Sequence, residues 1–174
     1  EFPEELIPQF QAFALNQRRP QFQDARVRRA FGLCFNFEWM QQNLFFGSYE
    51  KSQSTFEASE FKAEGMPSAE ELVLLEPHRA ELPPEAFGEA VTTPPGDVSG
   101  NNRKILAEAS RLLSEAGWKR QGVSLVNDKG EKLACEVLAD DEGAVRVFTP
   151  WVESLKQLGV DASIRLVDAT QYEQ

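Results

Sequence analysis

Few side chains in this sequence have the types and spacing that covalent catalysis requires. The sequence contains one histidine, His78, which stands between Pro77 and Arg79. A Ser-His-Asp arrangement would need His78 as its base, and neither a Gly-x-Ser-x-Gly motif nor a glycine-rich phosphate loop is present. We therefore expect His78 to be a surface residue and the protein not to be an enzyme. A hydrolase that uses His78 is the alternative from another class.

Two groups of charged side chains could bind ions. Asp140, Asp141 and Glu142 are consecutive, and hard cations prefer oxygen ligands. Because these residues lack the glycine and the spacing of a calcium loop, we favour a solvated turn and predict no metal site and no cofactor. A group of arginines could hold a carboxylate through bidentate hydrogen bonds, although such groups more often form the solvated side of a helix and pair with nearby acids. Its members are Arg18, Arg19, Arg26, Arg28 and Arg29.

Hydroxyl and aromatic side chains gather in an irregular stretch over residues 48–67. Little hydrophobic periodicity survives there, while aromatic residues punctuate a polar run. Irregular loops often carry ligand contacts, and aromatics that fix a long loop to the core are an equal alternative. We predict four residues of this stretch as ligand contacts, because they follow a helix end and mix aromatic with hydroxyl groups: Tyr49, Ser52, Ser54 and Phe56.

The length and charge of the chain exclude some classes of protein. At 174 residues the chain is near the usual size of one domain. The net charge of −10 opposes nucleic-acid binding, because phosphates attract basic surfaces. Residues 50–97 hold 11 acidic and 3 basic side chains, so we predict a largely irregular, solvated excursion over residues 48–100. No apolar run of membrane-spanning length and no signal peptide appear, but the chain opens on Glu1 rather than Met, which we interpret as a fragment.

Both cysteines, Cys34 and Cys135, lie among apolar residues. A thiol in such a place usually acts as a small hydrophobic group. The chain has no Cys-x-x-Cys pair, so a cysteine-based metal site is not expected. A disulfide between the two is the less favoured alternative.

One stretch, Leu112–Trp118, organises the elements that must position these side chains. Apolar residues at helical spacing predict a helix over residues 102–116, and Gly117 suits the left-handed residue that ends it. Strands are expected over residues 123–126 and 133–138, with a tight hairpin turn at Asn127–Gly130. Trp118 is assigned to the core, as is Trp151.

Other elements are predicted from their caps and periodicity. The aromatic-rich residues 10–15 indicate a strand, and Asp24 and Asn36 can cap two helices, the second ending at Gly47. Ser68–Glu71 matches a capping box that begins a short helix through Leu75. A proline- and glycine-rich extended linker follows over residues 82–100.

The sequence pattern of the C-terminal third predicts a strand, a helix and a second strand. Residues 143–158 form the helix, which Gly159 ends, and residues 160–167 alternate as a strand. Pro150 either kinks this helix or lies in the first turn after Thr149 as its cap. Strands 133–138 and 160–167 should lie parallel in a right-handed crossover, so we expect hairpin and crossover to share one sheet, covered by the 102–116 helix.

Three motifs occur in a recognisable order. The run over residues 16–31 contains Asp24-Ala25-Arg26-Val27-Arg28-Arg29-Ala30, the second is Leu112–Trp118 followed by Asn127–Gly130, and the third is Leu155–Ala162. Together they resemble the Asp-x-Arg-Val-Arg-x-Ala pattern, the Leu-Leu-x-Glu-Ala-Gly-Trp helix end and the leucine-glycine-valine step of the extracellular solute-binding proteins of family 5. These are the peptide-, nickel- and oligosaccharide-capturing subunits of ABC importers. Residues 37–40 and 44–47 look closest to the peptide-binding branch.

The resemblance implies an α/β fold, a type II periplasmic-binding-protein-like lobe whose mixed sheet has a hairpin and a βαβ crossover with helices packed on it. Residues 1–174 would then form a single lobe, or most of it, of a larger two-lobed protein. Its implied role is to capture oligopeptides or peptide-like solutes in the periplasm, as a monomer whose partner is an ABC permease in the membrane. The acidic residue that holds the ligand's amino terminus would lie beyond Gln174.

The sequence also departs from the family pattern. Asn36 stands where the family often has aspartate, and the acidic insert over residues 59–100 exceeds that of commoner members. The class of substrate therefore does not transfer from them. A sensor or interaction module built on the same fold is the alternative to a transport role.

Overall fold

Side-chain caps determine where the first helices begin. The computed structural model describes residues 11–57, 59–93 and 95–172. The Asp24 carboxylate accepts a hydrogen bond from the Arg26 amide (2.8 Å) at the start of one helix, and the Asn36 side chain accepts one from the Trp39 amide (3.3 Å) at the start of the next. Both predicted caps are confirmed. The elements are η1 (Pro20–Phe22), α1 (Ala25–Leu33) and α2 (Phe37–Asn43).

The predicted N-terminal strand is wrong for the residues that can be judged. Residues 11–15 form neither helix nor strand, and Phe10 lies outside the described residues. A strand needs a partner for its main-chain hydrogen bonds, and β-propensity expresses itself only where such a partner is present. Both sheets of the described chain are built from later residues.

Helix α4 (Arg103–Glu115) ends as its sequence predicts. Gly117 has φ +91°. Its amide donates to the Ser114 carbonyl (3.0 Å), and the Trp118 amide donates to the Leu113 carbonyl (3.0 Å), which is the pair of bonds of a Schellman motif. Trp118 and Leu113 are both buried, so the glycine stop also directs the next strand into the core.

The strand predicted over residues 123–126 pairs with a different strand from the one expected. Strand β1 (Lys119–Gln121) pairs antiparallel with β2 (Ser124–Val126). The expected reversal at Asn127 is present, because its side chain accepts from the amides of Lys129 and Glu131 at 3.0 Å each. Beyond it only one bridge, Val126↔Lys132, forms. The Leu133 amide also donates to the Leu125 carbonyl (2.9 Å), but β3 pairs with β4 and not with β2, so the expected ladder between residues 123–126 and 133–138 does not form.

The predicted βαβ unit is confirmed. Strand β3 (Ala134–Ala139) and strand β4 (Asp161–Leu166) are parallel, with Ala134 opposite Asp161 and Ala139 opposite Leu166. Helix α5 (Glu142–Leu158) joins them. The expectation that the hairpin and the crossover share one sheet is wrong, because β1–β2 and β3–β4 are two separate two-stranded sheets.

The crossover helix settles the open question about its proline. The helix is capped by Asp141, whose carboxylate accepts from the Ala144 amide (2.8 Å), and not by Thr149. Pro150 lies inside the helix, and Gly159 ends it at φ +95°. The Thr149 hydroxyl instead donates to the Val145 carbonyl (2.7 Å).

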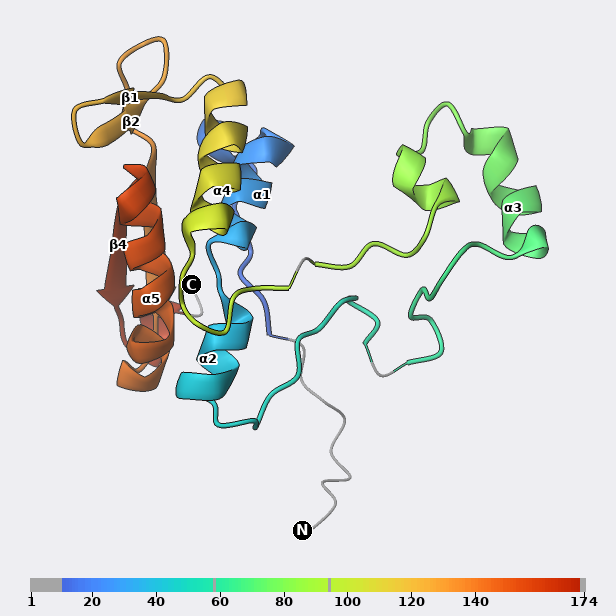
Figure 1. Cartoon of the computed structure of the whole chain (residues 1–174), viewed down its shortest axis with the longest axis horizontal. Coiled ribbons are helices and arrows are strands. Elements are labelled where there is room, and N and C mark those ends of the chain that lie inside the picture. The colour runs from blue at the N-terminus through green and yellow to red at the C-terminus, as the bar shows by residue number, and fades with distance from the viewer. Residues whose placement is uncertain (1–10, 58, 94, 173–174) are drawn as a thin grey trace. The chain divides into compact units, whose positions relative to one another are not determined.

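A single core joins these helices and sheets. Figure 1 shows α1 beside α4 and α5 beside β4. The Trp151 indole donates to the Phe31 carbonyl (2.9 Å), and the rings of Phe22 and Phe31 meet edge to face, 5.3 Å apart. Trp118 and Trp151 are buried, as predicted. Both cysteines are buried and free, so the predicted hydrophobic role is confirmed and the disulfide alternative is wrong.

The chain divides into two compact units. We call Ala14–Tyr49 with Pro95–Gln174 the main unit, and Glu1–Phe13 with Glu50–Pro94 the excursion unit. The main unit contains every element above, and its last element is α6 (Ala169–Tyr172).

In the excursion unit the predicted capping box is confirmed at the start of α3 (Ala69–Leu75): the Glu71 amide donates to the Ser68 hydroxyl, and the Ser68 amide donates to the Glu71 carboxylate. Its elements are α3 (Ala69–Leu75), η2 (Glu76–His78) and η3 (Pro84–Phe87).

The excursion unit lacks a core in its described part. None of its described residues is buried. Across the described residues of both units, no helix is both long and apolar enough to cross a membrane.

Candidate functional site

The first predicted ligand contact, Tyr49, is positioned by α2 in the main unit. The Tyr49 amide donates to the Gln41 side-chain oxygen (3.4 Å), and the Gln41 side-chain nitrogen donates to the Tyr49 carbonyl. One glutamine on the helix therefore holds both main-chain groups of Tyr49. The Tyr49 ring lies 4.8 Å from the ring of Phe45, which lies 6.0 Å from that of Phe37. These three aromatic residues form a ring cluster along α2 and the segment that follows it.

The turn between Phe45 and Tyr49 has an unusual backbone. Phe46 has φ +50° and Gly47 has φ +84°, and the Ser48 amide donates to the Phe45 carbonyl (2.9 Å). Positive φ at both central residues is the signature of a type I′ turn. Phe46 is the only non-glycine residue with positive φ in the described chain, and its side chain is 78% exposed.

Sequence reasoning did not single out Phe46. A glycine directly after it was the available signal, because a residue followed by glycine at a helix end can occupy the first position of such a turn. Asparagine or aspartate usually occupies that position, so the Phe-Gly pair was not recognised as a type I′ turn.

The other three predicted contacts, Ser52, Ser54 and Phe56, belong to the excursion unit. The Phe56 amide donates to the Ser54 hydroxyl (3.0 Å), so these two residues form one local turn. The Phe56 ring meets that of Phe61 edge to face, with centroids 6.2 Å apart. Because Tyr49 belongs to the main unit, the four residues as one site remain a prediction.

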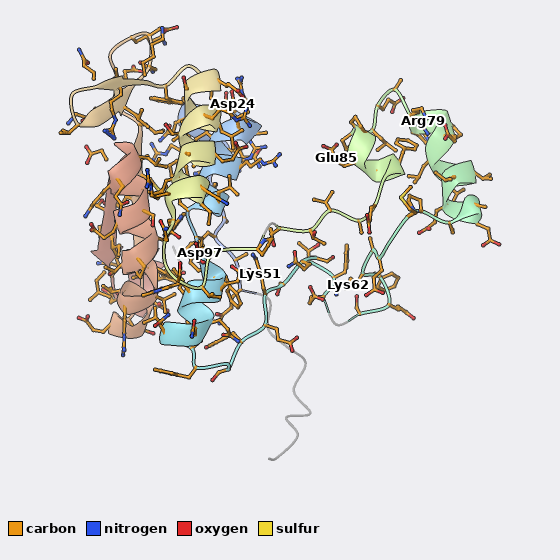
Figure 2. All side chains as sticks on the ribbon, viewed as in Figure 1. Asp24, Lys51, Lys62, Arg79, Glu85 and Asp97 are labelled. Atoms are coloured by element: carbon orange, nitrogen blue, oxygen red, sulfur yellow. The ribbon has the colours of Figure 1, made fainter. Side chains whose placement is uncertain are left out.

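Polar contacts fix the backbone around those three residues. The Gln53 amide donates to the Glu57 carboxylate (2.6 Å), and that carboxylate also pairs with Lys62 at 2.5 Å (Figure 2). The hydrogen bond from Lys62 lowers the pKa of Glu57. The Gln53 side-chain oxygen accepts from the amide and the hydroxyl of Thr93 (2.7 and 2.8 Å). These hydrogen bonds link the irregular segments around Gln53 and Thr93 within the excursion unit.

The remaining charged candidates have structural roles. The His78 side chain is 60% exposed, with its nearest acid, Glu81, at 3.9 Å, which confirms a surface residue. Beside it Arg79 pairs with Glu76 at 2.5 Å and stacks 3.8 Å from the centre of the Phe87 ring. Figure 2 labels Arg79 within the excursion unit.

Two of the arginines, Arg26 and Arg28, make local contacts within the main unit. Arg26 binds the Asp24 carboxylate (2.6 Å) and donates to the Glu115 carbonyl (2.6 Å), which ties α1 to the end of α4 (Figure 2). The side-chain hydrogen bond from Arg26 lowers the pKa of Asp24. Arg28 donates to the carbonyls of Phe22 and Gln23, both at 2.8 Å. The interpretation as the solvated side of a helix is supported by these contacts.

Of the acidic run over residues 140–142, Asp140 and Asp141 lie between β3 and α5, as predicted, whereas Glu142 is the first residue of α5. Asp141 serves as the cap of α5. Within residues 11–57, 59–93 and 95–172, no group of three or more His, Cys, Asp or Glu side chains could hold a metal ion. Burial raises the pKa of the Cys34 thiol to about 12 and that of the Cys135 thiol to about 11, so both thiols are protonated at neutral pH.

Asn36, predicted as a helix cap, is buried and also forms a polar junction that the sequence did not indicate. Its side-chain nitrogen donates to the Asp97 carbonyl and to the Asn102 side-chain oxygen, both at 2.8 Å. Gly96 passes so close that a β-carbon there would lie 2.2 Å from the Asn36 side-chain oxygen. The chain that leads into α4 is thereby fixed against the start of α2 (Figure 2).

Comparison with known proteins places this geometry among binding proteins. The family model of the bacterial extracellular solute-binding proteins, family 5 (middle part), matches residues 3–174. The probable peptide-binding protein YejA of Agrobacterium fabrum is 37% identical over 163 residues, which cover 93% of this chain and 26% of that protein. The chain thus spans about a quarter of the length of such curated relatives.

Solved structures share the fold. NikZ from Campylobacter jejuni, in complex with Ni(L-His), superposes with a TM-score of 0.61 at 16% identity, over 88% of this chain and 25% of that one. The oligopeptide-binding protein AppA from Bacillus subtilis, in complex with a nonapeptide, gives a TM-score of 0.56 at 16% identity, over 91% of this chain and 26% of that one. The predicted type II binding-protein fold is confirmed by these neighbours.

Proposed function

The chain belongs to the bacterial extracellular solute-binding proteins of family 5, and we propose that it is part of the substrate-binding component of an ABC transporter. The whole protein would capture oligopeptides or peptide-like solutes in the periplasm and deliver them to a permease in the membrane. The observation that carries this proposal is the family match over residues 3–174, joined to a 37% identical relative named as a probable peptide-binding protein.

The proposed mechanism is lobe closure without bond chemistry. A ligand that contacts both lobes binds the closed state more tightly than the open one and shifts the population by that difference in affinity. Main-chain hydrogen bonds would hold the peptide backbone, and roomy pockets would accept its side chains. The exposed position of His78 supports a binding role over the hydrolase alternative.

We propose Tyr49, Ser52, Ser54 and Phe56 as ligand contacts. Tyr49 is half exposed, at 51%, while its main chain is held by Gln41, so its ring is presented on a fixed backbone. Phe56 is exposed to a similar extent, at 55%. The Ser54 hydroxyl already accepts from the Phe56 amide, and its own proton is available to a ligand carbonyl.

The experiment that tests the function uses the full-length protein. We expect calorimetric titration with alanine-based peptides of two to nine residues to show saturable binding, and the unfolding temperature to rise in the presence of the ligand. Absence of binding to every peptide would contradict the proposal. Alanine replacement of the four proposed contacts should then weaken binding, and unchanged affinity would remove them from the site while leaving the function intact.

A further inference from the structure

Phe46 occupies a backbone conformation that its own side chain disfavours. A bulky residue at positive φ is an outlier, and glycine or asparagine normally fills this position of a type I′ turn. Phe46 has φ +50°. Such strain is retained where the surrounding structure or a function demands it, and it clusters at ligand-contacting sites.

The bonds that hold the turn do not need an aromatic ring at this position. They run between backbone groups of Phe45 and Ser48 and of Gln41 and Gly47 (2.9 and 3.1 Å), and from the Gln41 side chain to the backbone of Tyr49. Asparagine or glycine at position 46 could form the same set with less strain. The Phe46 ring is 78% exposed, so packing within the described chain does not account for it either.

The chemistry around the ring indicates what it contacts. Residues 45–49 contain no charged side chain, and the neighbouring rings of Phe45 and Tyr49 face each other at 4.8 Å, which leaves Phe46 as the outward aromatic group of the turn. A neutral aromatic surface favours an apolar or aromatic side chain over a charged one. Main-chain hydrogen bonds to a peptide cannot make that distinction, because every peptide offers the same backbone groups.

We propose that Phe46 is a specificity-determining residue that packs against an apolar side chain of the bound peptide. This inference rests on the proposed peptide-binding function and adds a preference to it. Hydrogen bonds hold the backbone of the turn, so the main chain need not be ordered on binding and the contact avoids that part of the entropic loss.

The test uses the full-length protein and alanine pentapeptides in which one leucine or phenylalanine is moved through each position. We expect the wild-type protein to bind the best apolar-substituted peptide about three- to tenfold more tightly than the all-alanine peptide. In Phe46→Asn this preference should disappear while affinity for the all-alanine peptide stays the same. The unfolding temperature of the ligand-free variant should equal or exceed that of the wild type, because asparagine tolerates the left-handed backbone.

Two variants serve as controls. Phe46→Tyr keeps an aromatic ring and should keep the preference. Val123→Asn removes another exposed apolar side chain of the main unit, which is 86% exposed and directly follows Gly122, a glycine with positive φ. This variant should also leave the preference intact.

Several results would overturn the inference. A wild-type protein that binds all the pentapeptides equally, or a Phe46→Asn variant that retains the preference, would exclude a role in specificity. A fall of several degrees in the unfolding temperature of ligand-free Phe46→Asn would show that the ring packs against the rest of the full-length protein. Failure of the wild type to bind any peptide would instead contradict the proposed function itself.

Discussion

At the scale of single residues, Asn36 shows why an amide suits the start of α2 better than a carboxylate. Its nitrogen donates to two oxygen atoms, the Asp97 carbonyl and the Asn102 side chain, and its side chain is 5% exposed. A carboxylate has no proton to donate and would place its charge against those oxygens. The surroundings of Asn36 therefore favour an amide over a carboxylate.

We predict that Asn36→Asp lowers the free energy of unfolding by about 2–4 kcal/mol, because two partly buried acceptors lose their donor and the new carboxylate is buried away from solvent. Urea denaturation of the 174-residue chain measures this change. Asn101→Asp, an exposed change in the same segment, should alter stability by less than about 0.5 kcal/mol. Equal stability of the two variants would contradict the assigned hydrogen bonds.

The two thiols provide a second residue-scale prediction. Burial raises the pKa of Cys34 to about 12 and that of Cys135 to about 11, so both stay protonated at pH 8. We expect a maleimide probe to label the native chain slowly, with Cys135 before Cys34, and the urea-unfolded chain rapidly. Mass spectrometry of the labelled peptides gives the order.

The same shift has a consequence for stability. A thiol whose folded pKa lies above its unfolded value disfavours the folded state once the unfolded chain ionises. Stability should therefore fall as the pH rises from about 9, the ordinary thiol value, toward 12. In the maleimide experiment described above, labelling of the native chain as fast as that of the unfolded chain at pH 8 would show that the thiols are not buried.

At the scale of elements, helix ends govern the path of the chain. The Schellman bonds at Gly117 end α4 and place Trp118 in the core before β1 begins. At Gly159 the left-handed backbone ends α5, and a β-carbon there would lie 3.0 Å from the Val123 carbonyl. The Gly159 carbonyl accepts from the Leu125 amide (2.8 Å), so this glycine also joins α5 to β2.

We predict that Gly117→Ala destabilises the main unit by about 1–2 kcal/mol, because a side chain is strained at φ +91°. Gly32→Ala is the matched control: Gly32 lies inside α1 with open space around its α-carbon, and alanine should stabilise that helix by about 0.5–1 kcal/mol. Opposite signs in thermal unfolding are the expected result. A stabilising Gly117→Ala would be inconsistent with the left-handed stop.

At the scale of the whole molecule, the two units differ in charge and in burial. The residues of the excursion unit carry the entire net charge of −10, and those of the main unit sum to zero. None of the described residues of the excursion unit is buried, whereas the main unit contains the hydrophobic core. A segment without buried side chains has little packing energy to oppose local opening.

We therefore predict that a glutamate-specific protease cleaves the 174-residue chain first within the excursion unit. Glu60, Glu64 and Glu70 are exposed there and should be cut well before Glu108 and Glu136 of the main unit. The comparison is internal, since all these sites share one residue type. Mass spectrometry of early time points identifies the fragments, and simultaneous cleavage in both units would show that the excursion unit is as stable as the main one.

Much of the fold follows from local sequence, because caps and stops depend on a few neighbouring residues. Asp24, Asn36 and Ser68 begin their helices where predicted, and Gly117 and Gly159 end theirs. The parallel pair β3–β4 also followed from the order strand, helix, strand. Of the proposed ligand contacts, Tyr49 and those in the irregular stretch after it were predicted from the sequence, whereas Phe46 was proposed from its backbone conformation.

Tertiary structure decided what local patterns leave open. The sequence predicted that residues 123–126 pair with residues 133–138, but in the folded chain β2 pairs with β1 and β3 pairs with β4. Residues 11–15 have β-favouring side chains but no described partner strand. The left-handed backbone of Phe46 arises because the end of α2, the Gln41–Tyr49 bonds and Gly47 together close the turn. Strand pairing and side-chain exposure depend on residues far apart in the sequence, and these contacts exist only once the chain has folded.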